Sequence, residues 1–503
     1  MDKSGSSEMV LPPPLEQQVG LKRDAIGLLG VSMQSITHIA PAIAAIFYTQ
    51  FVVSLTGLAA PLAYIVGVIV TMMLGVTLAQ LAKALPSAGG YYTYVSRGIH
   101  PRVGFLTSWM YTLYDPTTGG IMAGFFGYTL SQALHQYNGL DLPWLWWVSI
   151  LVAAPTLAYI QHRGIALSAQ FMLITGALEI LIVGVLSIWG LVRPGAGGFT
   201  FQVFNFSRKT SMEGFALAIV FSVQGLTGWE GAGPLAEETS NPRRNVPRAI
   251  LTSIAILGGF LVVSYWGQIV GFGANSLKGL TSSSTLPGIA LARRFWGPAY
   301  LILIFALFNS VMANALACAN VGTRMWYRMG RTGSLPRGLG RIHPKYQTPT
   351  VAILLQLAIS LATGLGIGLW LNPDRSFLFM VGLVLVMACI WIYVSGNVAC
   401  FMLYWRDRRS EFNVVMHLVF PIITTAALVY ALIESFIPFP AFPFNWTPAV
   451  DGAWLALGIG ILIVMKVRGN EKWLVEAGKA LDEAGGDELE PVEAGTGSGL
   501  TGE

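Results

Sequence analysis

The chain is poor in charge, because only 11% of its 503 residues are Asp, Glu, Lys or Arg, against roughly 25% in a typical soluble domain. Apolar residues make up 54% of it and the mean hydropathy is +0.61. This composition excludes an ordinary water-soluble globule. At about 20 apolar residues per crossing of a ~30 Å hydrocarbon layer, a dozen helical spans would use roughly 240 residues. The length therefore accommodates an all-α polytopic protein embedded in the lipid bilayer.

Cysteine and histidine are also scarce, with three and six residues. The cysteines, Cys318, Cys389 and Cys400, lie in apolar stretches, so the sequence indicates neither a disulfide framework nor a metal cluster. The histidines match no zinc-peptidase spacing, and neither a phosphate-binding loop nor a Gly-x-Ser-x-Gly motif occurs. These absences argue against an integral membrane enzyme and an ATP-driven pump. We expect no metal and no cofactor beyond a coupling ion.

Charge is also not concentrated anywhere in the folded part of the sequence. The net charge is +5, but the basic residues are spread over short loops, which excludes a nucleic-acid partner. No charged or carbonyl-rich filter segment recurs, as a channel would need. A tail at residues 1–23 contains three successive prolines, and a tail at 468–503 is acidic and rich in glycine. We expect both tails to be cytoplasmic, and the N-terminal tail and the stretch from Glu476 to Glu503 to be disordered. Both are too short for the signalling domain of a transporter-like sensor.

Twelve apolar windows are long enough to cross a membrane. They cover residues 25–54, 58–82, 103–134, 144–162, 166–192, 214–236, 249–272, 296–323, 350–371, 377–404, 413–435 and 450–467. With the N-terminus inside, the cytoplasmic segments hold 23 of the 30 Lys and Arg residues. The positive-inside rule therefore predicts twelve spans with both termini cytoplasmic, in the plasma (inner) membrane.

Two of these windows contain residues that interrupt helices. The first has Ser35-Ile36-Thr37-His38-Ile39-Ala40-Pro41 near its middle, and the sixth has a run with four glycines, Glu230 and Pro234. Free backbone groups at membrane depth are tolerated only where protein buries them or a cavity solvates them. Because the interruptions lie five spans apart, they favour a binding site between two repeats. A plain proline kink at each position is the alternative.

Three segments resemble the amino acid–polyamine–organocation transporter superfamily. The first is Pro86-Ser87-Ala88-Gly89-Gly90-Tyr91-Tyr92-Thr93-Tyr94. The second joins Gly228-Trp229-Glu230 to Glu237-Glu238-Thr239-Ser240-Asn241-Pro242. The third runs from Arg324 to Pro336 and is followed by His343-Pro344-Lys345. Because the three segments agree in order and position, they align spans 1 to 10 with those of the family.

The resemblance implies a leucine-transporter-like 5+5 inverted repeat with broken helices 1 and 6. It divides the chain into a ten-helix transport core at 24–404, with repeats at about 24–192 and 214–404, and helices 11 and 12 at 413–467. It also implies secondary transport of amino acids or related amines by alternating access.

The substrate site is predicted at the two interruptions, where half-helix ends expose backbone donors and acceptors to a zwitterion. Phe221, before the second interruption, is either a lid over the substrate or an ordinary packing aromatic. Pro41, Gly228 and Glu230 are expected to support the breaks. The residues predicted to contact substrate are Ser35, Thr37, His38, Ile39, Phe221, Gly225, Thr227 and Trp229.

Ionisable groups inside spans are costly and are therefore candidates for coupling. Glu179 has no local partner and is either a proton carrier or a neutral acid bonded to another helix. His38 can change protonation in the physiological range or simply bind a freed carbonyl. Asp115 can pair with a substrate ammonium group or with His38, or cap a helix after Pro116.

On the eighth span, Asn309, Ser310 and Asn314 can help to bind sodium or hold helices together. The prediction is a proton-coupled symporter, with a sodium-coupled symporter or an exchanger as alternatives. The sequence shows no intramembrane acidic cluster for a diamine and no intramembrane base pair for an acidic substrate, which favours a neutral amino acid.

Overall fold

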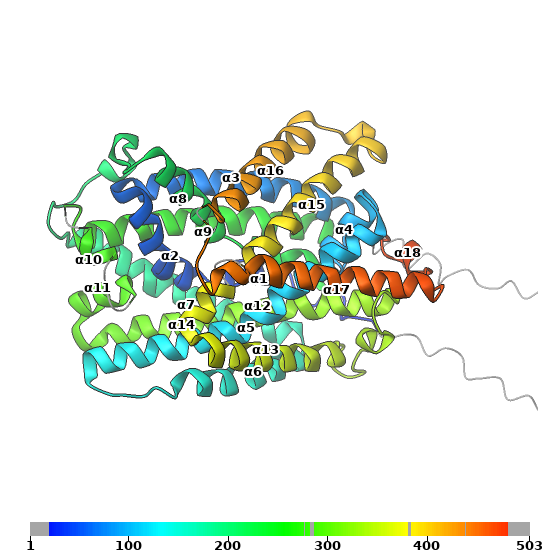
Figure 1. Ribbon diagram of the computed structural model, residues 1–503, viewed down its shortest axis with the longest axis horizontal. Helices are drawn as coiled ribbons and strands as arrows, with labels where there is room; N and C mark the ends of the chain where they lie inside the picture. Colours follow the sequence, from blue (N-terminus) through cyan, green and yellow to red (C-terminus); the bar gives the residue numbers. More distant parts are fainter. Residues whose placement is uncertain (1–19, 276, 282–285, 381–383, 438, 481–503) are drawn as a thin grey trace, which may run out of the picture.

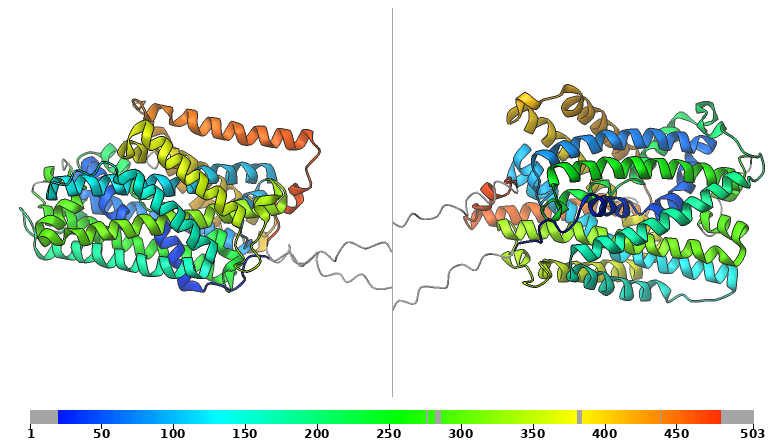
Figure 2. Two further views of the ribbon diagram at one scale, coloured as in Figure 1. Left: turned by 90° about the horizontal axis from the view of Figure 1, so that it is seen from below. Right: turned by 180° about the vertical axis from the view of Figure 1, so that it is seen from behind.

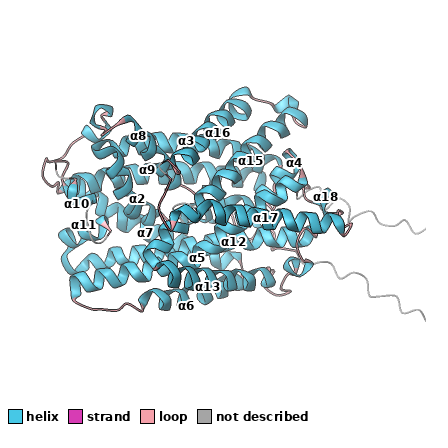
Figure 3. Ribbon diagram, in the orientation of Figure 1, coloured by secondary structure: helices cyan, strands magenta, loops and turns pink. Residues whose placement is uncertain are grey.

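The computed structural model describes residues 20–275, 277–281, 286–380, 384–437 and 439–480. Within these ranges the chain is helical and no strand forms (Figure 3), apart from one isolated bridge between Ile26 and Thr239. The tail predictions for residues 1–19 and 481–503 lie outside the described residues. Most of the long helices run along the long axis of the molecule (Figure 1).

Residues 20–272 form nine α-helices. They are α1 (Leu28–His38), α2 (Pro41–Thr56), α3 (Ala60–Ala84), α4 (Tyr91–Gly98), α5 (Pro101–Asn138), α6 (Leu145–Arg163), α7 (Ile165–Val192), α8 (Met212–Gln224) and α9 (Pro242–Phe272). A 3₁₀-helix, η4 (Trp229–Glu238), stands between α8 and α9.

The second half adds shorter helices between the spans. The α-helices are α10 (Lys278–Thr281), α11 (Pro287–Trp296), α12 (Leu301–Thr332), α13 (Thr350–Leu371), α14 (Pro373–Phe379), α15 (Leu385–Arg406), α16 (Phe420–Glu434), α17 (Thr447–Val467) and α18 (Trp473–Glu476). Single turns are η1 (Gly57–Ala59), η2 (Gln202–Phe204), η3 (Phe206–Arg208), η5 (Gly297–Tyr300), η6 (Arg337–Gly340), η8 (Arg409–Glu411), η10 (Phe444–Trp446) and a π-helical turn, η9 (Val415–Val419).

These helices confirm the twelve predicted spans. In the part of the chain that the structure describes, eight helical segments are long and apolar enough to cross a membrane. They overlap nine of the predicted windows, because the first segment holds both spans 1 and 2. The remaining windows are α5, α6, and the pair α8 and η4. Their outward faces carry exposed apolar side chains such as Leu354, Leu369 and Ile422, as a lipid-facing surface requires.

Helix contacts reproduce the inverted repeat. Spans 2, 3 and 4 pack on spans 7, 8 and 9 through α3 with α9, α5 with α12, and α6 with α13. Other contacts occur in matched pairs: α7 packs on α12 as α15 packs on α5, and α1 packs on α9 as α8 packs on α3. The two contacts of each pair are equivalent when spans 1 to 5 are exchanged for spans 6 to 10. The contact of spans 5 and 8, for example, becomes the contact of spans 10 and 3. Because five is odd, the second repeat runs in the opposite sense through the bundle.

Both ends of the described chain lie at one end of the bundle, which we call the termini side. Leu21 packs with Ala88 and Tyr327. At the other end of the chain, Trp473 of α18 is buried against Phe105 at the start of α5, with ring centroids 5.9 Å apart. The start of the predicted acidic tail, from residue 468 to residue 480, is therefore packed on the bundle, and most of the stretch predicted to be disordered, from Glu476 onwards, lies outside the described residues.

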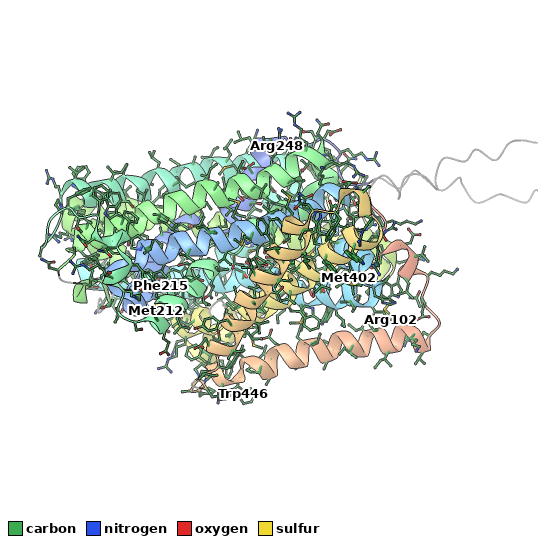
Figure 4. All side chains as sticks on the ribbon, turned by 90° about the horizontal axis from the view of Figure 1, so that it is seen from above. Arg102, Met212, Phe215, Arg248, Met402 and Trp446 are labelled. Carbon is green, nitrogen blue, oxygen red and sulfur yellow. The ribbon has the colours of Figure 1, made fainter. Side chains whose placement is uncertain are left out.

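The α17 helix lies along the outside of the bundle (Figure 2, left). It runs from Trp446 at one end to the termini side, where Arg102 is found near α18 (Figure 4). Its side chains are mostly exposed, so it adds little to the core.

Candidate functional site

The first span is broken between its two halves. The α1 helix ends at His38, Ala40 adopts a left-handed conformation with φ of 58°, and α2 begins at Pro41. Proline at the first helical position lacks only an N–H that would have no partner there. The His38 carbonyl, freed by the break, accepts a hydrogen bond from Nδ2 of Asn314 at 2.5 Å.

The sixth span breaks at Gly228, where φ is +115°. A Cβ atom at this position would lie 2.5 Å from the carbonyl oxygen of His38, so only glycine allows the two breaks to approach. The Glu230 carboxylate accepts from the Gly228 N–H at 3.1 Å and from the Tyr111 hydroxyl at 3.2 Å. Glu230 thereby ties the second break to α5.

A cavity of about 320 Å³ opens between the two breaks. Its polar end includes His38, Gly225 and Thr227, and the carbonyl-binding Asn314 lies beside them. The other walls come from α2, α3, α5, α8, α14, α15 and α16 and are mainly aliphatic and aromatic. Among the described lining residues there is no Lys, Arg, Asp or Glu.

His38 and Asp115 form a buried pair at the edge of this cavity. Nε2 of His38 lies 2.8 Å from Oδ1 of Asp115, and both side chains are fully buried. The α5 helix continues through Pro116 from residue 101 to 138, so no helix begins there for Asp115 to cap. Of the three roles predicted for Asp115, the capping role is wrong and pairing with His38 is observed.

Glu179 lies at the N-terminus of α2. Its Oε2 accepts a hydrogen bond from the Ala42 N–H at 3.0 Å, and the next free N–H of α2, that of Ile43, donates to Oγ of Ser310 at 3.3 Å. A carboxylate is favoured at a helix N-terminus because the unpaired N–H groups and the helix dipole are positive there. Glu179 therefore fastens the second half of the broken span to α7.

Four residues predicted to contact substrate do not line the cavity. The Ser35 hydroxyl accepts from the Ala232 N–H at 3.0 Å and joins α1 to η4, while the Thr37 hydroxyl donates to the Met33 carbonyl within α1.

The other two residues outside the cavity are aromatic. Phe221 stacks on Phe51 with ring centroids 5.8 Å apart, so it packs α8 on α2. Trp229 is buried against Tyr393, with ring centroids 5.3 Å apart. The periodicity of the sequence does not distinguish an aromatic side chain that faces the cavity from an aromatic side chain that is buried between helices nearby.

The predicted sodium ligands are divided among different tasks. Ser310 binds the N-terminus of α2 and Asn314 binds the first break, whereas Nδ2 of Asn309 has no partner within the described part of the chain. Asn320 instead bonds to Gln34 of α1 and Gln161 of α6. Polar side chains of α12 therefore hold helices together.

Comparison with known proteins identifies the family. A family model described as amino acid permease matches residues 26–465. The chain belongs to the amino acid permease family. The permease is 26% identical over 406 residues to the low-affinity putrescine importer PlaP of Escherichia coli (strain K12), covering 77% of this chain and 83% of the importer.

Two further relatives are similar over most of their length. The serine/threonine exchanger SteT of Bacillus subtilis (strain 168) is 24% identical over 384 residues, or 74% of this chain and 81% of SteT. The Asc-type amino acid transporter 1 of Mus musculus is 23% identical over 408 residues, or 80% of this chain and 72% of the mouse protein. These relatives are transporters, which agrees with the transport class inferred from the sequence.

On the termini side of the permease, two ion pairs join η4 to α12. Arg324 binds Glu238 through two hydrogen bonds of 2.8 and 3.1 Å, and Arg331 binds Glu237 at 2.7 Å. Burial alone would raise the pKa of the Glu237 carboxyl, but Arg331 and Arg328 together hold that pKa below its ordinary value. Arg243 donates to backbone carbonyls at the end of α3.

Several cavity residues of the permease escaped the sequence analysis. Tyr114 of α5, Gln224 of α8, and Cys389 and Tyr393 of α15 face the cavity, and so does Tyr48 of α2. The tenth span carries no interruption to mark it, so nothing local to its sequence indicated that two of its side chains line the site.

Proposed function

We propose that this permease transports a neutral amino acid by alternating access, driven by a proton that binds at Glu179. The observation that carries the proposal is the cavity between the two breaks, with freed backbone groups at one end and apolar walls at the other. The breaks offer carbonyls to an ammonium group. The Tyr393 hydroxyl, which lines the cavity and has no hydrogen-bond partner among the described residues, can donate to a carboxylate.

The lining favours a substrate without net charge. Apart from His38, which is already paired with Asp115, the described walls contain no basic or acidic side chain. A charged side chain on the substrate would lose its hydration in the cavity without gaining an oppositely charged partner, which is costly. The aliphatic and aromatic walls suit the side chain of a neutral amino acid.

The position of Glu179 supports proton coupling. When charged, its carboxylate binds the N-terminus of α2 through the Ala42 N–H. A proton removes the charge and weakens this contact, because a neutral acid interacts less with a helix N-terminus. Proton binding can therefore release α2 from α7, and this coupled movement of the second half of span 1 is the proposed link to transport.

The orientation is part of the proposal. Both described ends lie on the termini side, and most Lys and Arg residues fall in segments assigned to the same side by the sequence. By the positive-inside rule we place this side in the cytoplasm and the protein in the plasma (inner) membrane.

The test uses purified permease in proteoliposomes, with pooled labelled amino acids and amines, and with proton or sodium gradients imposed separately. We expect one neutral amino acid to accumulate only under an inward proton gradient. Glu179→Gln should abolish accumulation but retain substrate binding and exchange against preloaded substrate. Glu213→Gln, at an exposed position near the start of α8, is the matched control and should accumulate normally.

Full gradient-driven accumulation by Glu179→Gln would refute the coupling role while leaving transport intact. A requirement for sodium would refute proton coupling, and exchange without net uptake would make the protein an exchanger. Failure of every pool, including in exchange, would refute the amino acid substrate.

A further inference from the structure

Three side chains capable of binding a transition metal lie together, although they come from three different spans. His38 ends α1, Asp115 lies within α5 and Cys318 lies within α12. One ring nitrogen, one carboxylate oxygen and the sulfur atom all lie within 4.8 Å of one another. None of the three side chains is more than 1% exposed. Sequence spacing could not show this cluster, because 77 residues separate His38 from Asp115 and Cys318 is still farther along the chain.

We propose that His38, Asp115 and Cys318 form a binding site for a divalent zinc-class ion. Ligands at about 2.0–2.3 Å from a tetrahedral ion lie about 3.3–3.8 Å apart. A separation at the 4.8 Å limit of the cluster would therefore shorten by roughly 1–1.5 Å, and the 2.8 Å contact between His38 and Asp115 would widen. A thiolate and a carboxylate together cancel the two charges of the ion, while imidazole adds a neutral ligand. Thiolate and imidazole favour zinc or cadmium over magnesium and calcium.

Neighbouring groups already orient the ligands. Asn314 lies one turn before Cys318, accepts from its sulfur at 3.7 Å, and donates to the carbonyl of His38. Oδ2 of Asp115 and Nδ1 of His38 are buried and have no partner in the described part of the chain. Oδ2 is therefore available to an ion without breaking an existing hydrogen bond. Such outer contacts hold ligands in place in known metal sites.

The cluster adjoins the transport cavity, because His38 and Asn314 both line that cavity. Water or an amine can complete the coordination there. Metal binding displaces the protons of the thiol and of the His38–Asp115 hydrogen bond. An ion in this position would connect the broken first span to the two uninterrupted helices α5 and α12. We therefore expect the bound ion to arrest transport.

Binding is measured directly on the purified protein, without any transport assay, so that the result does not depend on the proposed substrate. Cd²⁺ is titrated and the ultraviolet absorption of cadmium–thiolate bonds is recorded. We expect one Cd²⁺ per protein, displaced by Zn²⁺ and unaffected by excess Mg²⁺. Cys318→Ser should weaken binding by at least about 100-fold. Cys389→Ser is the matched control, since Cys389 is also buried and lines the same cavity but is not in the cluster.

Equal binding by wild-type protein and Cys318→Ser, or no stoichiometric binding by the wild type, would overturn the proposal. The melting temperature of each variant shows whether it is folded, and Asp115→Asn provides a second variant with the same expected loss. If both variants unfold, X-ray absorption at the zinc edge of the loaded wild-type protein decides. One sulfur at about 2.3 Å with nitrogen and oxygen at about 2.0–2.1 Å supports the site, and a shell without sulfur refutes it.

Discussion

The ion pair between Arg324 and Glu238 is buried on the termini side, and Glu238→Gln should open that side. The two side chains are 0% and 1% exposed, so the variant leaves a buried guanidinium without its counter-charge. Its remaining side-chain acceptors are Oγ1 of Thr323 at 3.2 Å and Oδ1 of Asn320 at 3.4 Å, which are neutral. Removing one partner of a buried ion pair typically costs about 3–5 kcal/mol. Opening hydrates the guanidinium and recovers much of this energy.

Hydrogen exchange of two backbone amides next to the pair measures this effect. The Ile26 N–H donates to the Glu238 carbonyl at 3.1 Å, and the Ser240 N–H donates to the Ile26 carbonyl at 2.9 Å. If the variant shifts the closed-to-open equilibrium by 3–5 kcal/mol, these amides should exchange about 10²- to 10⁴-fold faster. Glu411→Gln removes a partly exposed ion pair with Arg408 and should change exchange by less than about tenfold.

A double variant separates the buried charge from the loss of the contact. Glu238→Leu with Arg324→Met removes both charges, and replacement of a buried pair by apolar residues is often neutral or stabilising. We expect exchange in the double variant to return towards the wild-type rate. Unchanged exchange in Glu238→Gln, or equally fast exchange in the double variant, would refute the reasoning.

Two further predictions concern the second break and the C-terminal segment. Gly228→Ala places a Cβ atom 2.5 Å from the His38 carbonyl oxygen at a φ of +115°. It should lower the free energy of unfolding by at least about 1–3 kcal/mol, and with it the melting temperature. Gly366→Ala is the control and should leave the melting temperature nearly unchanged, because no heavy atom lies within 4 Å of the added Cβ atom. Trp473→Ala removes a side chain that is 3% exposed and should weaken the docking of α18 by about 3–5 kcal/mol. Proteolysis between α17 and α18 should then be faster than in the wild-type protein. Cleavage at the wild-type rate would show that this side chain does not hold α18.

The elements that could be predicted from the sequence are those specified by local chemistry. Hydropathy located the spans because the bilayer requires about 20 apolar residues for each crossing. Pro41 and Gly228 located the breaks because proline lacks an N–H and only glycine tolerates the backbone conformation and the close contact at the second break. Neither signal depends on a partner elsewhere in the chain.

The remainder depended on contacts between distant segments. The α4 helix falls in a predicted loop and α18 in the predicted acidic tail, yet both are held by buried aromatic side chains such as Tyr92 and Trp473. Glu179 and Ala42 are 137 residues apart, so the capping contact has no local signature. The same holds for Phe221, whose partner Phe51 lies on another helix. Residue type alone identified candidates, but tertiary packing decided which of them face the cavity.

The break at Ala40 separates two polar attachments of the first span. Its first half is held through His38 to Asp115 of α5 and Asn314 of α12, and its second half through Ala42 to Glu179 of α7. Because Ala40 lies between helices and not within one, the two halves can shift separately. A proton at Glu179 acts on the second half, whereas an ion at the cysteine-containing cluster acts on the first. Glu179→Gln should therefore leave Cd²⁺ affinity unchanged, and a large loss of Cd²⁺ affinity in that variant would show that the two halves move as one rigid unit.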